Sequence, residues 1–227
     1  MDKIIVLIGA PGAGKGTQAR LLQERKGIPQ ISTGDIFREM KEADTPLANE
    51  IREIMASGRL ISDALTFEVV KSRVSREDCG GTYILDGFPR TEMQASMLET
   101  LAEETGKKLQ AIQIDVPFES LEKRMTGRRS CPVCGEIYNI YFKPPKNDTV
   151  CDFHPDAQLN HRADDYEEKV KVRLATYEEQ TKPLIDYYEN SGRLEKVDGM
   201  GSVEEIYREI EKLVSPVSKV QSPESVS

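Results

Sequence analysis

A glycine-rich segment with a single lysine, near the start of the chain, has the residue types and spacing to bind phosphate. Its sequence is GAPGAGKGT from Gly9 to Thr17; it follows the apolar run Lys3–Ile8 and precedes a segment with helical character at 18–25. The pattern G-x-x-x-x-G-K between a strand and a helix is typical of loops whose backbone N–H groups surround phosphate oxygens, beside the partially positive N-terminus of the helix. The sequence therefore predicts nucleoside triphosphate binding, with Lys15 reaching the β- and γ-phosphates.

The residue after this lysine departs from the strict pattern, in which a hydroxyl residue follows directly and binds Mg2+. Here Gly16 follows Lys15, and Thr17 comes one position later. We therefore expect Mg2+ to be held mainly through water and carboxylates. Asp86, at the end of an apolar strand-like segment, is one candidate. Asp35 is a second, although a role as a helix N-cap explains that residue equally well.

Several arginines stand where phosphoryl transfer needs positive charge. Transfer between two anionic substrates requires neutralisation of the charge between them, and arginine offers bidentate donors that stay protonated. Single arginines on helices usually lie in solvent, so the local setting decides. Five candidates follow strand-like segments or border a cysteine-containing segment: Arg38, Arg90, Arg128, Arg129 and Arg162. A sixth, Arg173, lies eleven residues beyond Arg162. We expect Arg162 and Arg173 to share one face of a helix that begins at Asp164.

Three of the four cysteines form a cluster with metal-ligand spacing. Cys131 and Cys134 form one C-x2-C pair; Cys151 and His154 form a second pair, with sixteen residues between the two pairs. Three thiolates and an imidazole are a donor set that Zn2+ prefers, and a site closed by four ligands is structural. A redox-active cysteine pair and an empty site are alternatives, and His161 is a second choice for the fourth ligand.

These residues lie among alternating strand-like and helix-like segments. Apolar, β-branched runs occur at 3–8, 29–32, 82–86, 109–116 and 194–197. Such alternation predicts βαβ units, and hence a parallel sheet with helices on both faces. One helix start has a capping-box sequence, with Thr91 followed three residues later by Gln94. A functional role for Gln94 would instead use its amide to recognise the edge of a base.

Two segments interrupt this alternation, and a third follows it at the C-terminal end. Residues 34–62 have helical patterning without a strand, and residues 127–165 are rich in Cys, Pro, Asn and Asp, which favours short strands and turns. Both are expected to be inserts on the α/β core. Residues 215–227 are rich in Ser, Pro and Val without periodicity, which predicts a disordered tail.

Five motifs, GAPGAGKGTQ, TGDIFR, DGFPRT, GRR and HRADD, occur in this order along the chain. In this order and at these separations they resemble the adenylate kinase family, and the resemblance covers about residues 3–214. It implies an α/β fold of the P-loop nucleoside monophosphate kinase type, with a five-stranded parallel sheet flanked by helices and two small inserted domains. The chain is similar to the long form of the family, which has a full-length LID insert. Zinc-bearing LIDs occur in this family with Cys or Asp as the usual fourth ligand, so His154 departs from the pattern.

The resemblance also implies an activity and a domain organisation. The activity is reversible phosphoryl transfer from MgATP to AMP, giving two ADP. The implied core comprises residues 1–31, 62–126 and 165–214; the AMP-binding insert is 32–61, the LID insert is 127–164 and the tail is 215–227. Core and inserts are expected to move as separate bodies.

Site residues carry over from the family motifs position by position. The implied ATP-binding residues are Gly12, Ala13, Gly14, Lys15, Gly16, Thr17, Arg124, Arg128, Ile137, Tyr138 and Gly201. The implied AMP-binding residues are Thr33, Arg38, Arg59, Leu60, Ile61, Gly87, Phe88, Pro89, Arg90, Gln94, Arg162 and Arg173. The implied catalytic residues are Lys15, Arg38, Arg90, Arg128, Arg162 and Arg173.

Composition restricts the possible partners and location. The net charge is -8, which argues against broad nucleic-acid binding because such partners require a basic surface. No apolar run is long enough for a membrane span, and the first residues lack the basic and small-residue regions of a secretory signal. We therefore expect a cytoplasmic protein. Because the sequence has no long exposed apolar stripe, we expect a monomer.

Three other functions remain as alternatives. The first is a kinase for a different nucleoside monophosphate, since the choice of base depends on few contacts. The second is a zinc-knuckle ATPase that binds nucleic acid, favoured only by the basic stretch 123–129. The third is a nucleotide sensor without catalysis, which the retained Lys15 and the arginines disfavour. No Ser/His/Asp or Cys/His nucleophile set is apparent, and transfer between two bound nucleotides needs none.

Overall fold

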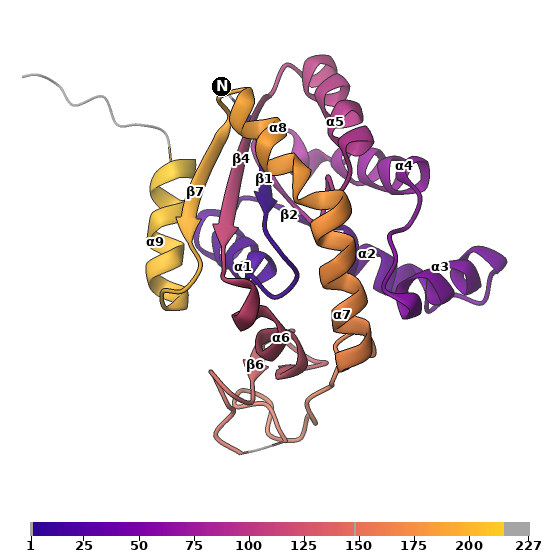
Figure 1. The fold of residues 1–227 in the computed structure, drawn as a ribbon, viewed down its shortest axis with the longest axis vertical. Helices are drawn as coiled ribbons and strands as arrows, with labels where there is room; N and C mark the ends of the chain where they lie inside the picture. Colours follow the sequence, from indigo (N-terminus) through magenta and orange to yellow (C-terminus); the bar gives the residue numbers. More distant parts are fainter. Residues whose placement is uncertain (1, 148, 216–227) are drawn as a thin grey trace, which may run out of the picture.

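The central element of the chain is a parallel sheet of five strands in the order β2-β3-β1-β4-β7 (Figure 1). The computed structural model describes residues 2–147 and 149–215, so the predicted tail lies, from residue 216 on, outside the described residues. The strands are β1 (Lys3–Ile8), β2 (Gln30–Ser32), β3 (Tyr83–Asp86), β4 (Lys108–Asp115) and β7 (Leu194–Asp198). This confirms the predicted α/β class, because every strand lies within one residue of its expected bounds.

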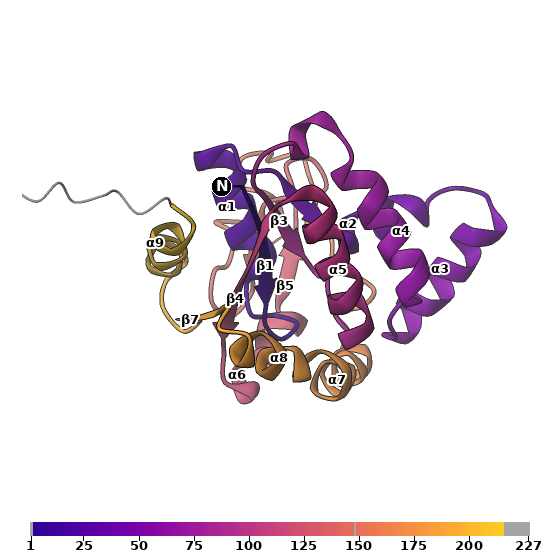
Figure 2. The same cartoon turned by 90° about the horizontal axis from the view of Figure 1, so that it is seen from above.

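Helices cover both faces of this sheet. They are α1 (Lys15–Lys26), α4 (Asp63–Val74), α5 (Glu92–Thr105), α6 (Phe118–Thr126), α7 (Glu167–Thr176), α8 (Pro183–Asn190) and α9 (Val203–Val214), with a 3-10 turn at Glu77–Cys79 and a π-helical turn at Tyr177–Thr181. Figure 2 shows α1 and α9 on one side of the sheet and α5 and α8 on the other.

The continuous apolar run of β1 supplies two separate cores. Ile5 and Leu7 pack with residues of α1 and α9 on one face, whereas Ile4 and Val6 pack with residues of α5 and α8 on the other. These four side chains are at most 3% exposed. A strand buried on both faces cannot alternate apolar with polar residues, which explains the sequence of this segment.

The phosphate loop lies at the point where the chain changes direction across the sheet. β1 pairs with β3 on one side and β4 on the other, so the successive crossovers diverge at its carboxyl end. Ligands in open parallel sheets bind at such switch points. The β1–β3 register pairs Leu7 with Asp86 and thereby brings this carboxylate to the same edge.

Two predicted helix starts differ from the structure. α1 begins at Lys15 and not at residue 18, because the Gln18 N–H already donates to the Gly14 carbonyl at 3.1 Å. α7 begins at Glu167 and not at Asp164. The prediction that Arg162 and Arg173 share a helix face is therefore wrong, because Arg162 precedes the helix.

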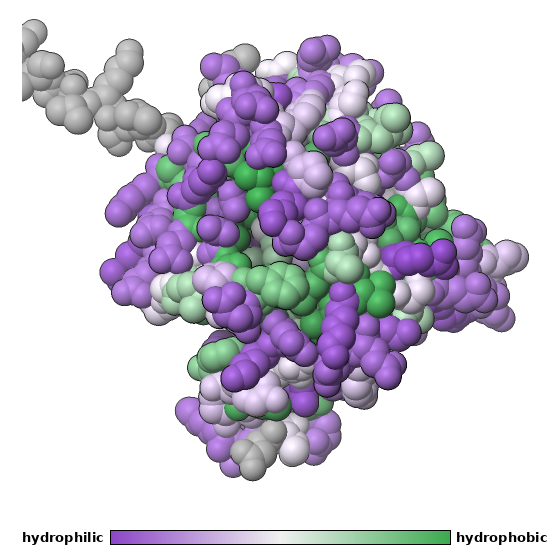
Figure 3. All heavy atoms as spheres, viewed as in Figure 1, coloured by the Kyte–Doolittle hydropathy of each residue, from purple (hydrophilic) through white to green (hydrophobic). Residues whose placement is uncertain are grey.

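The two interrupting segments have the predicted local structure. Residues 34–62 contain most of α2 (Thr33–Met40) and all of α3 (Pro46–Ser57), and α3 extends to one side of the molecule in Figure 1. Residues 127–165 contain the antiparallel pair β5 (Arg128–Ser130) and β6 (Ile137–Asn139). This second segment forms the lower lobe of the mostly hydrophilic face in Figure 3.

Across residues 2–147 and 149–215, each helix is too short or too polar to traverse a bilayer.

Candidate active site and metal centre

Glycine conformation shapes the phosphate loop. Gly12 and Gly14 have φ of +87° and +102°, in the region that favours glycine. A Cβ on Gly12 would lie 2.9 Å from the Met125 Cγ and 3.2 Å from the Leu121 carbonyl oxygen, both in α6. The loop therefore bends tightly against α6. Lys15 Nζ donates to the Gly9 carbonyl at 2.7 Å and to the Ala10 carbonyl, so the ammonium lies within the loop.

Lys15 is a half-buried cation with a perturbed pKa. Burial is the largest cause; together with the nearby guanidiniums, and against the opposing effect of Asp86, it lowers the pKa of Lys15 to about 8. The Asp86 carboxylate lies against the loop, since a Cβ on Gly16 would be 3.2 Å from its Oδ2. Gln30 Nε2 donates to the same oxygen at 3.3 Å. A carboxylate in this position fits a hydrated cation beside bound phosphates.

Asp165 holds two of the predicted arginines together. Its carboxylate is fully buried. Arg128 donates to both carboxylate oxygens, from Nε at 2.7 Å and Nη2 at 2.5 Å, and Arg173 Nη1 donates to one of them at 2.9 Å. Arg173 also pairs with the Asp164 carboxylate at 3.0 Å. Charge-assisted, bidentate pairs of this kind fix guanidinium orientation.

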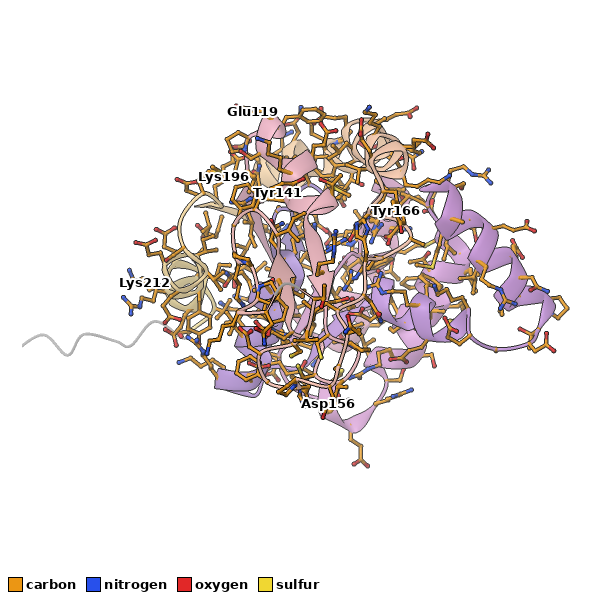
Figure 4. All side chains as sticks on the ribbon, turned by 90° about the horizontal axis from the view of Figure 1, so that it is seen from below. Glu119, Tyr141, Asp156, Tyr166, Lys196 and Lys212 are labelled. Carbon is orange, nitrogen blue, oxygen red and sulfur yellow. The ribbon has the colours of Figure 1, made fainter. Side chains whose placement is uncertain are left out.

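Arg90 and Arg162, two other arginines of the cluster, have less compensation from neighbouring carboxylates than Arg128 and Arg173 have from Asp165. Burial, followed by repulsion from neighbouring guanidiniums, lowers the pKa of Arg90 and Arg162 to about 10. Burial would raise the pKa of Asp164, but the surrounding arginines outweigh it and lower that pKa. Figure 4 shows side-chain nitrogens gathered near the centre of the molecule, not far from Tyr166. An excess of buried positive charge suits a polyanionic ligand.

The phosphate loop and the arginines line one cavity of about 1510 Å³. A typical small-molecule site has roughly 300–1,000 Å³, so this cavity has room for two nucleotides. All the predicted ATP-binding residues line it: Gly12, Ala13, Gly14, Lys15, Gly16, Thr17, Arg124, Arg128, Ile137, Tyr138 and Gly201. It is also lined by Arg38, Asp86, Pro89, Arg90, Arg162 and Arg173. Arg129 instead donates to the Thr126 carbonyl at 3.0 Å.

A smaller cavity adjoins the large one and gathers the remaining predicted residues. It shares Arg38, Leu60, Gly87, Arg90 and Arg173 with the large cavity and adds Thr33, Arg59, Ile61 and Gln94. Phe88 is the exception among the predicted AMP-binding residues. The residue is fully buried, its ring stacks 6.4 Å from that of Phe67, and it lines neither cavity.

Only half of the predicted capping box at the start of α5 forms. The Thr91 Oγ1 accepts from the Gln94 N–H at 3.1 Å, as predicted. The Gln94 side chain bonds elsewhere: its Oε1 accepts from the Arg90 N–H at 2.8 Å and its Nε2 donates to Asp63 Oδ1 at 2.9 Å. The reciprocal capping bond is therefore a wrong prediction, and the amide lies in the wall of the smaller cavity.

Asp35 is not the N-cap of α2. Ser32 takes that position, and its hydroxyl accepts from the Asp35 N–H at 3.3 Å. The Asp35 carboxylate instead pairs with Arg38, which donates from Nη2 at 2.5 Å. Burial would raise the pKa of Asp35, but Arg38 outweighs it and lowers that pKa. The carboxylate thus orients an arginine at the edge of the large cavity.

The four predicted metal ligands come together. The donor atoms of Cys131, Cys134, Cys151 and His154 all lie within 4.8 Å of one another. The Cys134 and Cys151 sulfurs are 3.7 Å apart, and the Cys151 sulfur is 3.8 Å from His154 Nδ1. Tetrahedral Zn2+ with Zn–S bonds of about 2.3 Å separates sulfurs by about 3.8 Å, so the set fits this ion. His154 completes the group, whereas the His161 ring packs against that of Tyr166, 4.6 Å away and tilted by 57°.

The segment that carries this cluster also contacts the phosphate-loop helix. Arg20 of α1 donates to the Gly135 carbonyl at 2.8 Å and to the Glu136 carboxylate at 2.7 Å. Glu136 pairs in turn with Lys143. Gly135 directly follows Cys134, so these contacts join the cluster of three cysteines and His154 to the edge of the large cavity.

Sequence analysis assigned no role to Asp165, Asp63 or Arg20. The doubled aspartate of the HRADD motif, close to Arg162, was a signal that could have indicated an ion-pair network. The bonds from Asp63 to Gln94 and from Arg20 to Glu136 span 31 and 116 positions. No local pattern could have revealed these two contacts.

A phosphate loop at the switch point of a parallel sheet, in a cleft lined by arginines, defines a nucleotide-dependent phosphotransferase of the P-loop class. Comparison with known proteins shows to which family within this class the chain belongs. A family model described as "Adenylate kinase" matches residues 7–193. The chain is 48% identical to an adenylate kinase of Thermodesulfovibrio yellowstonii over 91% of this chain and 96% of that protein. It is 47% identical to one from Clostridium perfringens, over 92% and 97%, and 44% identical to one from Bacillus velezensis, over 95% and 99%. The chain belongs to the adenylate kinase family.

The buried position of Asp165 predicts a large effect on stability. Replacing Asp165 by Ala leaves Arg128 and Arg173 without their shared partner, and breaking a buried pair in this way costs about 3–5 kcal/mol. The measurement is the free energy of unfolding in urea. Asp156→Ala, in the same segment but exposed (Figure 4), is the control and should change it by less than about 0.5 kcal/mol. Equal stability of the two variants would show that the pair is not structural.

Proposed function

We propose that this chain catalyses reversible transfer of the γ-phosphoryl group of MgATP to AMP, giving two ADP, and thereby maintains the balance of adenine nucleotides. Family membership supports the reaction. The observation that carries it is the large cavity, which joins the phosphate loop to a second, smaller cavity through a group of arginines. That arrangement has room for two nucleotides with their phosphates facing each other.

In this proposal the phosphate loop holds ATP. The backbone of residues 12–17 surrounds the phosphates, and Lys15 stabilises the transferring group. Arg124 and Arg128 contact ATP from α6 and β5, and Ile137 and Tyr138 border the adenine with the backbone of Gly201. The position of Arg124 supports this, since its Nη2 donates at 2.9 Å to the Gly199 carbonyl, two residues before Gly201.

The smaller cavity holds AMP in this proposal. Thr33, Arg38, Arg90 and Gln94 bind it, together with the backbone at 59–61 and 87–89. The hydroxyl of Thr33 donates to the Gly87 carbonyl at 2.9 Å, so these two parts of the wall are already joined. Gln94 lies at the wall with an amide, the group that recognises an adenine edge.

Catalysis then consists of positioning and charge neutralisation. Phosphoryl transfer spreads negative charge over the transferring group, and preorganised guanidiniums stabilise that charge without reorganisation. The proposed residues are Lys15, Arg38, Arg90, Arg128, Arg162 and Arg173. Mg2+ bound with ATP supplies further neutralisation at the phosphates, and Asp86 would hold it through water. No covalent intermediate is needed, because both substrates are bound at once.

Water must be excluded from this site, or ATP would be hydrolysed. We propose that residues 1–31, 62–126 and 165–214 form a core on which the AMP-binding insert 32–61 and the LID insert 127–164 close. Residues of both inserts line the same cavity, which supports this division. A closing LID delivers Arg128 and Arg162 at the same time as it removes water.

We propose that the four ligands Cys131, Cys134, Cys151 and His154 hold a structural Zn2+. The apolar core of this segment is small, consisting of Cys131, Tyr138 and Cys151 with Ala157 and Leu159 against them. A metal ion supplies folding free energy that such a core lacks. All four protein ligands are used, so the site keeps no open position for catalysis.

The remaining proposals concern the setting of the enzyme. We propose that it acts as a monomer in the cytoplasm, on small nucleotides, without nucleic acid or membrane partners. A kinase for a different nucleoside monophosphate is the alternative, because the base contacts are few.

The direct test is ADP formation by the purified protein with MgATP and, separately, AMP, GMP, CMP and UMP. Rapid turnover with AMP and slow turnover with the others is the expected result. Preference for another monophosphate would keep the fold and change the substrate. Intact ATP binding without transfer to any monophosphate would contradict the proposed activity.

The pKa of Lys15 predicts how ATP affinity depends on pH. A bound phosphate stabilises the ammonium, so binding raises this pKa above its free value of about 8. Affinity is therefore full below about pH 8 and falls as pH rises above it, by at most about tenfold per unit. Calorimetric titration of MgATP between about pH 7 and about pH 9.5 measures this. Lys15→Met should bind weakly and without this pH dependence. A constant affinity for the unmodified protein across the range would refute the assignment.

The choice of His154 predicts which variant loses the metal. His154→Asn should lose most of the Zn2+ measured by mass spectrometry, and its thermal unfolding should begin at a lower temperature. His161→Asn, the matched control, should retain one equivalent. The phosphate loop lies outside the cluster, so ATP binding should outlast partial loss of the metal. Full zinc content in His154→Asn, or an unchanged melting temperature after chelation, would contradict a structural site.

A further inference from the structure

One carboxylate beside the proposed AMP site has contacts that the activity described above does not explain. Asp63, the half-buried first residue of α4, accepts two hydrogen bonds at a single oxygen. One comes from the Thr91 hydroxyl and the other from Gln94 Nε2, both at 2.9 Å. Asp63 therefore connects the start of α4 to the start of α5, at the residue proposed to meet the base.

The two neighbours of the Gln94 amide fix which way round it lies. A carboxylate only accepts hydrogen bonds, so the end of the amide that faces Asp63 must be the NH2 group. A backbone N–H only donates, so the end that faces the Arg90 N–H must be the oxygen. Both constraints select the same orientation, and Gln94 is only 1% exposed, so solvent does not compete for these groups.

The amide retains hydrogen-bonding capacity for a ligand. An amide oxygen has two lone pairs and an NH2 group has two hydrogens, and one of each is used by the protein. One acceptor and one donor remain, on a residue that lines the smaller cavity. The base edge of adenine offers a ring nitrogen that accepts and an amino group that donates, so it matches this pair. A 6-oxopurine offers a ring N–H and a carbonyl, the reverse arrangement.

We propose that Asp63 is a specificity-determining positioning residue: it fixes the orientation of the Gln94 amide and makes the monophosphate site select a 6-aminopurine over a 6-oxopurine. This inference rests on the proposed function, in which Gln94 meets the base of AMP. Asp63 does not touch the substrate; it acts through Gln94.

The selection arises from the penalty for turning the amide over. To match a 6-oxopurine, Gln94 would direct its oxygen at the Asp63 carboxylate and its NH2 group at the Arg90 N–H. Two hydrogen bonds would be replaced by an acceptor–acceptor and a donor–donor contact, and buried groups left unpaired are costly. A side chain at position 63 that can also donate removes the first of these conflicts.

The experiment compares AMP with IMP, which differ at this edge while the ring system stays the same size. In Asp63→Asn, the ratio of kcat/KM for IMP to that for AMP should rise on the order of tenfold, which corresponds to the loss of one charge-assisted hydrogen bond. The KM for AMP should rise, while the KM for MgATP should be unchanged. Glu68→Gln removes the same charge from an exposed position on the same helix and should leave the ratio unaltered.

Two further variants separate positioning from folding. Asp63→Ser, whose hydroxyl both donates and accepts, should also raise the ratio and serves if Asp63→Asn does not fold. In a Gln94→Leu background, Asp63→Asn should change the ratio no further, because the residue through which it acts is gone. A protein that phosphorylates AMP, but whose IMP to AMP ratio is the same in both Asp63 variants, would overturn this inference alone. Failure of the unmodified protein to phosphorylate AMP would overturn the proposed function.

Discussion

The concentration of like charge in one cleft is the constraint on which the rest of the structure depends. Burial and mutual repulsion lower the pKa of Lys15 to about 8 and that of Arg90 to about 10, so the cleft disfavours the charged forms of its own cations. Asp165, fully buried between Arg128 and Arg173, relieves part of this repulsion. The unrelieved part favours the binding of two phosphorylated nucleotides, because their negative charge completes the neutralisation.

The sheet and the inserted segments supply different residues of this cleft. The sheet supplies the fixed parts, since the β1–β3 register places the phosphate loop and Asp86 at one edge. Arg38 and Arg162 come from segments outside the sheet, so the complete cluster exists only when these segments lie over the core. Arg20, through its bonds to Gly135 and Glu136, makes one such contact with the segment that carries the Cys131–His154 cluster. In the proposed mechanism, charge neutralisation and closure are therefore linked in the same residues.

The features that could be predicted from the sequence depend on residues that are close together along the chain. The phosphate loop and the Cys131–His154 set depend on spacing within short segments, and the structure brings each of them together as expected. The strand-like runs gave the sheet because burial on both faces leaves a continuous apolar pattern. Gln94 shows the limit of prediction from local patterns. Its position suited a capping box, but its amide instead donates a hydrogen bond to Asp63, which is 31 residues away. Asp165 shows the same limit, since a carboxylate in a charged motif does not reveal that it is fully buried.

The central claim is that one continuous cleft holds both nucleotides with their phosphates facing each other. The most direct measurement is calorimetric titration with a compound in which two adenosines are joined by a polyphosphate chain. The account predicts one molecule bound per protein chain, with an affinity that falls as salt rises and competition from both ATP and AMP. Two molecules bound per chain, or competition from ATP alone, would contradict it.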